Sequence, residues 1–292
     1  MLTKGKKDLV VVPFDFTDQS HTALLHASAI AAQNEDEVRL LHIIDANTPH
    51  RMKSAGINEA TVEEALQKIA AENESAYGVI TTFHATKGNF LTDIGPYIKA
   101  SEARFGVMGT HGVHGIQHIV GAKSLKIVAS SPAPIVIVQK RKIDEKGYKR
   151  IVLPVDGNKR GKNKIAYTAA MAKYFNSEVC IFEAHAEDQY VANRIEHNSQ
   201  LATDYFTENG IKYRVEKEEP GKGTYPKQLI RYAGQLDADL AVISSHHDQE
   251  GVVDFFLSHH EVQIINNDLQ MAVMCVNPVE PVEHLEIASF TW

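Results

Sequence analysis

The residues best suited to chemistry lie in a glycine-rich stretch that contains Gly109, Gly112 and Gly121. Glycine lets backbone N–H groups turn toward an anion, and the N-terminus of a following helix adds partial positive charge. A short apolar segment precedes the stretch at 105–108, and a helix-like run follows it at 124–129. The spacing fits neither a Walker A loop nor a dinucleotide-binding fingerprint. We therefore expect a phosphate-binding loop of another kind.

Histidines offer an alternative chemistry, because imidazole and carboxylate groups suit zinc or another transition ion. Two groups of candidate ligands occur: His111, His114 and His118, and later His246, His247, Asp248, Glu250, His259 and His260. Cys-His zinc spacing is missing, and adjacent histidines rarely ligate one ion together. We therefore interpret these residues as solvated loop histidines and assign no metal ligand, so whether a metal binds stays open.

The sequence assigns no catalytic residue. Ser244-Ser245-His246 does not form the Gly-x-Ser-x-Gly turn of a nucleophilic serine. No pair of carboxylates is placed around a common site by sequence alone. The protein is therefore interpreted as a binding module rather than an enzyme, with slow or metal-assisted hydrolysis of a bound nucleotide as the alternative.

Composition limits the classes of function. The chain has 292 residues, 43% hydrophobic and 23% charged, which is ordinary for a folded protein. Its net charge of −7 does not favour a nucleic-acid partner. No apolar run approaches the roughly 18 residues that span a bilayer, and no secretory signal is seen, so we expect a cytoplasmic protein with no membrane partner. Cys180 and Cys275 lie in apolar strand-like runs, which indicates buried thiols.

The chain contains an internal repeat. The segment from Val10 to Asp15 parallels the segment 151–156, so that Pro13 and Asp15 fall on Pro154 and Asp156. A length near 300 residues also suggests two domains. We therefore predict one domain over 1–141 and a second over 148–280, joined by a short charged linker.

Each copy alternates short apolar runs with helical patterns, which predicts parallel strands covered on both faces. Strands are predicted at 9–14, 38–44, 79–84, 105–109 and 134–138, and at 150–155, 178–184, 211–216, 239–243 and 272–276. Helices are predicted at 19–33, 60–76, 90–103 and 122–130, and at 162–175, 189–209, 224–236 and 259–267. The fold class is therefore α/β, with two doubly wound Rossmann-like domains. Such domains bind ligands beyond the carboxyl ends of their strands, where Pro13-Phe14-Asp15 and the loop from Gly109 could meet.

The paired Pro-x-Asp strand ends, the glycine loop and the element order together resemble a tandem universal stress protein, with the motif of the ATP-binding class in the first domain. The resemblance covers almost the whole chain and implies a five-stranded parallel sheet in each half. One loop position departs from the family pattern, because Ala122 stands where a serine or threonine hydroxyl would contact phosphate.

The resemblance also implies a candidate site for ATP or another adenine nucleotide. Asp15 would lie beside adenine or ribose, backbone near Ile43 would frame the base, and the glycine loop would line ribose and phosphates. For Asp15 the alternative is a helix-capping or turn-forming residue. The candidate residues are Pro13, Phe14, Asp15, Ile43, Met108, Gly109, His111, Gly112, Gly115, Gly121, Ala122, Lys123 and Ser124.

In the second half the glycine pattern is lost, since Gly251 alone remains and Asp248 and Glu250 put negative charge where phosphate would lie. The resemblance therefore implies a nucleotide-responsive stress or regulatory module that works through its first half. The two halves would pair through their last strands as an intrachain pseudo-dimer, a homodimer is a further candidate, and the protein partner is unidentified. A structural stress protein that has lost nucleotide binding stays open as another alternative.

Overall fold

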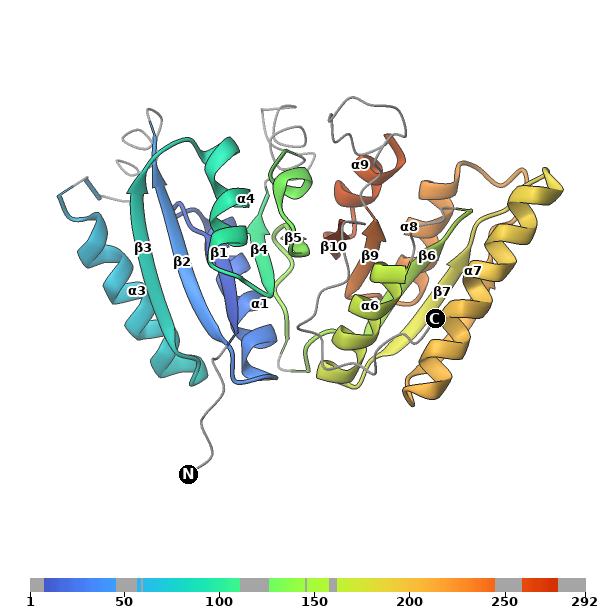
Figure 1. The fold of residues 1–292 in the computed structure, drawn as a ribbon, viewed down its shortest axis with the longest axis horizontal. Helices are drawn as coiled ribbons and strands as arrows, with labels where there is room; N and C mark the ends of the chain where they lie inside the picture. Colours follow the sequence, from blue (N-terminus) through green and yellow to red (C-terminus); the bar gives the residue numbers. More distant parts are fainter. Residues whose placement is uncertain are drawn as a thin grey trace. The chain divides into compact units, whose positions relative to one another are not determined.

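Short buried strands alternate with helices through both halves of the protein in the computed structural model (Figure 1). The structure describes residues 8–45, 57–58, 60–110, 126–144, 146–157, 162–244 and 259–277. The chain divides into two compact units, unit 1 (Met1–Ile143) and unit 2 (Asp144–Trp292). This division falls within the predicted charged linker.

Unit 1 is built on five parallel strands in the order β3-β2-β1-β4-β5. The strands are β1 (Leu9–Pro13), β2 (Glu37–Ile44), β3 (Thr81–Lys87), β4 (Phe105–Gly109) and β5 (Ile135–Val138). The helices are α1 (Asp18–Ala32), α3 (Val62–Tyr77) and α4 (Phe90–Ala100), and residues 126–130 are also helical. All five residues of β1 are buried, because helices cover both faces of the sheet.

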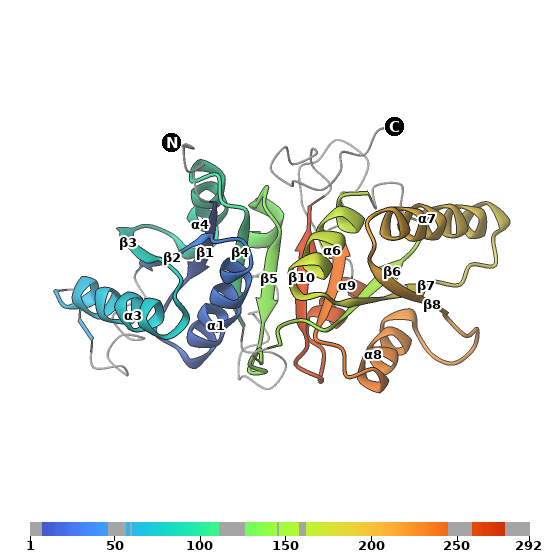
Figure 2. The same ribbon diagram turned by 90° about the horizontal axis from the view of Figure 1, so that it is seen from below.

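The helices of unit 1 are divided between the two faces of its sheet. Figure 2 shows α1 and α3 on one face and α4 on the other. Helix α1 packs on the central strands β1 and β4, and α3 packs on the edge strand β3. The hydrophobic core of unit 1 therefore lies on both faces of the sheet and is centred on β1, the strand between β2 and β4.

Unit 2 repeats this plan, with five parallel strands in the order β10-β9-β6-β7-β8. The strands are β6 (Arg150–Val155), β7 (Glu178–Glu183), β8 (Lys212–Lys217), β9 (Leu240–Ser244) and β10 (Ala272–Val276). The helices are α6 (Lys162–Phe175), α7 (Gln189–Glu208), α8 (Tyr225–Gln235) and α9 (His259–Ile265). Helix α6 packs against α7, and α8 packs against α9.

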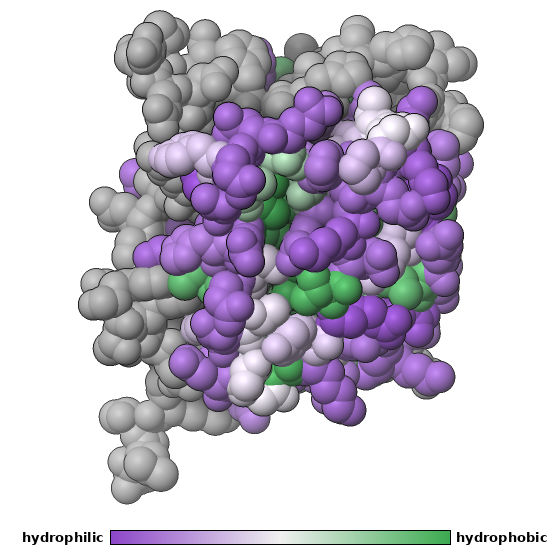
Figure 3. Space-filling model, turned by 90° about the vertical axis from the view of Figure 1, so that its right-hand side faces the viewer, coloured by the Kyte–Doolittle hydropathy of each residue, from purple (hydrophilic) through white to green (hydrophobic). Residues whose placement is uncertain are grey.

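Strand β8 forms an edge of its sheet, and all six of its residues are exposed. Its two large hydrophobic residues, Tyr213 and Val215, alternate with charged ones. Figure 3 shows a mostly hydrophilic surface on this side of the molecule, with hydrophobic residues in small separate patches. Charged side chains on an exposed edge strand discourage pairing with another chain.

The predicted fold class, two doubly wound α/β domains with five parallel strands each, is confirmed. Element ends differ where strand pairing or side-chain hydrogen bonds decide them. Strand β3 lies at 81–87 rather than 79–84, because Val38 to Ile44 of β2 pair with it in that register. Helix α9 ends at Ile265, and two residues later the Asn267 amide donates to the carbonyl oxygens of Ile264 and Met271, which holds the chain in a loop.

Two further sequence predictions concern burial. Both cysteines are buried free thiols, as predicted. Burial raises the pKa of Cys180 to about 11 and raises the pKa of Cys275 still further, so both thiols stay protonated at neutral pH. Within the described part of the chain, no helix is long and apolar enough to cross a membrane.

Candidate functional site

The topology of unit 1 puts its switch point, the usual location of a ligand crevice in doubly wound sheets, at the carboxyl ends of β1 and β4. From β1 the chain continues to β2 and β3 on one side, and β4 and β5 lie on the other side. Strands β1 and β4 are direct neighbours, with Val10 opposite Phe105 and Val11 opposite Gly106. Ligands of doubly wound sheets bind at such a switch point. Pro13 ends one of these strands and Gly109 ends the other, so the structure brings these two predicted site segments together.

Asp15 shapes the turn that leads from β1 into α1. Its Oδ1 atom accepts hydrogen bonds from the backbone N–H of Thr17 at 3.2 Å and from the Thr17 hydroxyl at 2.6 Å. The Thr17 hydroxyl in turn accepts from the N–H of Ser20 and caps the helix. The turn-forming role weighed for Asp15 is therefore present in the structure, whereas the helix cap is Thr17.

Aromatic side chains surround the end of β1. Phe14 makes edge contacts with Phe16 and His21, at ring-centroid distances of 5.4 and 5.0 Å, and Phe16 lies 5.1 Å from His42. The Nδ1 atom of His42 lies 2.7 Å from the carbonyl oxygen of Phe14, which links β2 to the turn. Phe16 has a φ of 64°, which is uncommon for a bulky residue and marks a sharp change of direction.

Sequence reasoning missed His21, Phe16 and His42, although they lie against the predicted site residues. The signal for His42 is a polar residue within the apolar run of β2, and the structure buries it. The signal for Phe16 is weaker, because the residue type phenylalanine does not indicate a left-handed backbone conformation. Together with Phe14, these residues form an aromatic wall at the carboxyl end of β1.

Gly109 is required by packing between β4 and α1. A Cβ atom added at Gly109 would meet the backbone carbonyl of Gln19 closer than real Cβ atoms approach, and would lie 2.9 Å from the Gln19 Cβ. The neighbouring Met108 is buried, and the N–H of Thr110 donates to the carbonyl of Val138 at 2.8 Å. The glycine therefore lets the first turn of α1 approach the end of β4.

The other predicted site residues divide into two sets. Ile43 is buried near the end of β2, one strand away from the crevice. The loop residues lie outside the described part of the chain: His111, Gly112, Gly115, Gly121, Ala122, Lys123 and Ser124. Their roles at phosphate stay predictions.

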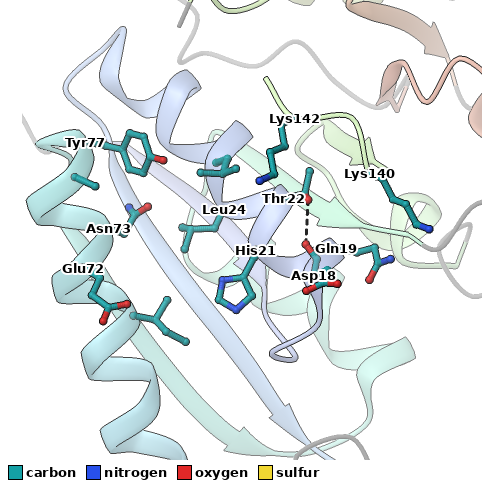
Figure 4. Close-up of a pocket in the computed structure, with 13 residues that line it drawn as sticks. Asp18, Gln19, His21, Thr22, Leu24, Glu72, Asn73, Tyr77, Lys140 and Lys142 are labelled. Atoms are coloured by element: carbon teal, nitrogen blue, oxygen red, sulfur yellow. Dashed lines mark hydrogen bonds between the residues drawn. The ribbon is translucent and has the colours of Figure 1, made fainter. Parts of the chain in front are cut away.

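A cavity of about 590 Å³ lies elsewhere in unit 1, between α1 and α3 (Figure 4). Its apolar floor includes Leu24 and Ile69, and its rim carries Asp18, Glu72 and two lysines from the segment after β5. Because the rim holds charges of both signs, it favours neither an anion nor a cation. The first turn of α1 contributes to the cavity and also packs on Gly109, so one end of the cavity approaches the strand ends.

In unit 2, two of the protein's own side chains hydrogen-bond to backbone near the carboxyl ends of β6 and β7, the counterparts of β1 and β2. The ammonium of Lys164 is buried and donates to the carbonyl oxygen of Pro154 at 2.5 Å. The hydroxyl of Tyr225 donates to the carbonyl oxygen of Phe182 at 3.2 Å. Burial lowers the pKa of Lys164, an effect that Asp156 partly offsets, and burial raises the pKa of Tyr225.

The described residues include no group of three or more histidines, cysteines or carboxylates that could hold a metal ion. Both histidine-rich stretches weighed as metal sites fall mainly outside those residues, namely 111–118 and 246–258. The metal interpretation is therefore left untested.

The sequence of unit 1 matches the model of the universal stress protein family over residues 8–139. A universal stress protein from Methanocaldococcus jannaschii is 28% identical over 141 residues, which cover 46% of this chain and 82% of the relative. The match to the family model falls in the first half of the chain, where the Gly-x-x-Gly sequence occurs.

The fold is similar to that of a solved universal stress protein. The crystal structure of a universal stress protein from Archaeoglobus fulgidus DSM 4304 aligns with a TM-score of 0.70 and 19% identity, and covers 94% of this chain and 99% of that one. A second universal stress protein from Archaeoglobus fulgidus, solved in complex with dAMP, covers 44% of this chain and 98% of that one, with 17% identity and a TM-score of 0.36. Adenine nucleotide binding is a property of that second protein.

Proposed function

The first half of the chain, residues 8–139, belongs to the universal stress protein family, and we propose on this premise that unit 1 binds ATP or another adenine nucleotide. The observation that carries the proposal is the adjacency of β1 and β4 at the switch point, with the glycine-rich sequence following Gly109 directly. The backbone N–H groups of that loop would bind phosphate, and the segment around Asp15 would contact ribose or base.

The proposed biological role is regulatory rather than catalytic. A bound nucleotide would change how the protein associates with a partner protein, in the cytoplasm and in response to stress. Among the described residues around the crevice, the Asp15 carboxylate and the His42 imidazole already form hydrogen bonds within the turn that follows β1 and the aromatic wall. We therefore expect the nucleotide to be retained without release of phosphate, and sustained phosphate release would favour the hydrolase alternative instead.

We expect at most one nucleotide per chain, bound in unit 1. In unit 2, Lys164 and Tyr225 hydrogen-bond to backbone near the ends of β6 and β7, and the sequence of this unit has lost the glycine pattern. Gly112→Val should weaken ATP binding by about 1–3 kcal/mol, because a side chain would block backbone approach to phosphate. The measurement is calorimetric titration with ATP.

Gly251→Val is the matched control for this titration, because Gly251 is the glycine that remains in the loop of unit 2. We expect it to leave both the affinity and the stoichiometry unchanged. Two equivalent sites in the wild-type protein, or equal affinities in the folded Gly112→Val variant and the wild type, would contradict the assignment to unit 1.

A second expectation concerns the missing hydroxyl. Ala122→Ser should tighten ATP binding by about 1.5–3 kcal/mol before local costs, because the new hydroxyl can donate to a phosphate oxygen. Adenosine has no phosphate, so its affinity should change little. Calorimetry with both ligands, and with Ala122→Gly as a variant that adds no hydroxyl, checks this. Equal tightening of ATP and adenosine, or tightening of neither, means that Ala122 does not lie at the phosphate.

A further inference from the structure

The cavity between α1 and α3 in unit 1 has two walls that hydrogen bonds hold in place. On the α3 side, the Asn73 amide accepts a bond from the Ser28 hydroxyl at 3.0 Å and donates to the Thr81 hydroxyl at 2.8 Å, which fixes α3 to α1 and β3. On the other side, the segment after β5 is fixed to α1, because Nε2 of His26 lies 3.0 Å from the carbonyl oxygen of Arg141. The cavity is therefore preorganised, which lowers the cost of binding a ligand.

Gln19 supplies the observation that points to a ligand. Its side chain lines the cavity, and the residue is only 9% exposed. Within the described part of the chain its side-chain amide forms no hydrogen bond, and neither amide atom is fully closed off from solvent. A largely buried amide without partners is costly, and a ligand that offers it one acceptor and one donor would remove that cost.

The rim of the cavity carries opposite charges at separate places (Figure 4). Glu72 lies on α3, whereas Lys142 extends toward the cavity from the segment after β5, and Lys140 points away from it. Glu72 also lies 3.8 Å from Lys68, but both side chains are mostly exposed, so this pair contributes little and does not prevent contact with another ammonium group. A ligand with an ammonium group at one end and a carboxylate at the other would match this rim.

Between these charges the floor of the cavity is apolar. Leu24 is buried, and Leu25, Ile69 and Ala76 extend the apolar surface toward the half-exposed ring of Tyr77. Apolar side chains of a ligand would be removed from water here, which is favourable. The volume of about 590 Å³ falls within the range of pockets that enclose small molecules.

We propose that this cavity of unit 1 binds a short apolar peptide with free termini. The ammonium terminus of the peptide pairs with Glu72, and its carboxylate terminus pairs with Lys142. The peptide group offers one N–H and one C=O, which are the partners that the Gln19 amide lacks. A free amino acid has no peptide group for Gln19, and a nucleotide has no ammonium group for Glu72. The site is separate from the proposed nucleotide site and binds its ligand without nucleotide.

The experiment is calorimetric titration of the full-length protein with leucyl-leucine, in the absence of nucleotide. We expect saturable binding of one dipeptide per chain. N-acetylation removes the ammonium charge of the dipeptide, and C-terminal amidation removes its carboxylate charge. Each change should weaken binding about threefold, the scale of one partly exposed ion pair.

Three variants assign the contacts. Lys142→Gln should weaken binding of leucyl-leucine about threefold and leave the affinity for the amidated dipeptide unchanged, because that ligand has no carboxylate. Gln19→Met should weaken binding of all three ligands about fivefold, since each keeps the peptide group. Lys99→Gln is the matched control, because Lys99 is an exposed lysine on α4 that does not line the cavity, and it should change no affinity.

The proposal is overturned if leucyl-leucine shows no saturable binding, if both blocked dipeptides bind as tightly as the free one, or if a folded Gln19→Met variant binds it unchanged. Equal weakening of the free and amidated dipeptides by Lys142→Gln also overturns it. Lys142 is exposed, so its variant is a valid test even if Gln19→Met fails to fold. Gly112→Val should bind the dipeptide like the wild type, whatever its effect on ATP, and loss of dipeptide binding there would place the ligand at the glycine loop instead.

Discussion

When the pH falls from 7 to 4, the free energy of unfolding of the wild-type protein is expected to decrease by about 3 kcal/mol more than that of a His26→Gln variant. His26 lies on α1 and is buried, and burial lowers its pKa from 6.5 to about 4. Its Nε2 atom lies 3.0 Å from the carbonyl oxygen of Arg141, an acceptor, so this nitrogen carries the proton of the neutral ring. The bond ties α1 to the segment that follows β5.

The direction of the effect follows from proton binding. Above pH 6.5 the His26 imidazole is neutral in the folded and unfolded chains, and its contribution to stability is fully present. As pH falls from 6.5 toward 4, the unfolded chain binds a proton that the folded chain does not, so the free energy of unfolding decreases. Below about pH 4 both states are protonated and the contribution is lost.

Urea unfolding followed by circular dichroism at pH 7 and pH 4 measures this loss, in the transition that includes unit 1. Glutamine does not titrate, and its amide can still donate to the Arg141 carbonyl. His84→Gln is the control, because His84 is exposed and packs on Tyr97 at the sheet edge, so that variant should keep the wild-type pH dependence. Equal losses in His26→Gln and the wild type would show that His26 does not cause the acid sensitivity.

Gly109→Ala is expected to lower the free energy of unfolding of unit 1 by about 1–3 kcal/mol, the usual cost of overpacking a tight contact. The obstacle is the backbone of Gln19 in the first turn of α1, which cannot rotate away as a side chain could. To admit the methyl group, α1 must move relative to β4. Urea unfolding of the variant and the wild type at neutral pH measures the cost.

Gly234→Ala provides a glycine substitution with the opposite expectation. In α8, an added Cβ would lie 3.2 Å from the Cδ2 of Leu269, the flexible end of a side chain. Alanine also favours a helix over glycine by roughly 0.5–1 kcal/mol, so this variant should be neutral or stabilising. If Gly109→Ala is as stable as Gly234→Ala, close packing is not the reason for a glycine at the end of β4.

Most of the fold was predictable from the sequence, because its signals are local. Short apolar runs between helical patterns predicted the parallel strands, and the repeated Pro13-x-Asp15 and Pro154-x-Asp156 segments predicted two similar units. The ends of β3 and α9 were less predictable, because register with β2 and the side-chain bonds of Asn267 decide them. Predictions about an edge strand or a helix end fail in this way when a tertiary contact outweighs a local pattern.

The candidate site was predictable only at the level of topology. The order of strands and helices was enough to expect the ends of β1 and β4 at one crevice, where Pro13 and Gly109 lie. The glycine spacing after Gly109 predicted phosphate binding, which stays a prediction. The sequence did not show the aromatic wall of Phe16, His21 and His42, because these rings meet only after α1 and β2 are packed beside the end of β1.

By itself the sequence determined the fold class, the repeat and the order of strands that makes β1 and β4 neighbours, since periodicity and motif spacing are properties of neighbouring residues. The tertiary structure decided what individual side chains do. It placed Gln19 against Gly109, the Arg141 carbonyl on His26, and the buried Lys164 at the strand ends of unit 2. These effects depend on burial and on contacts between residues far apart in the chain, and neither is encoded in a local pattern.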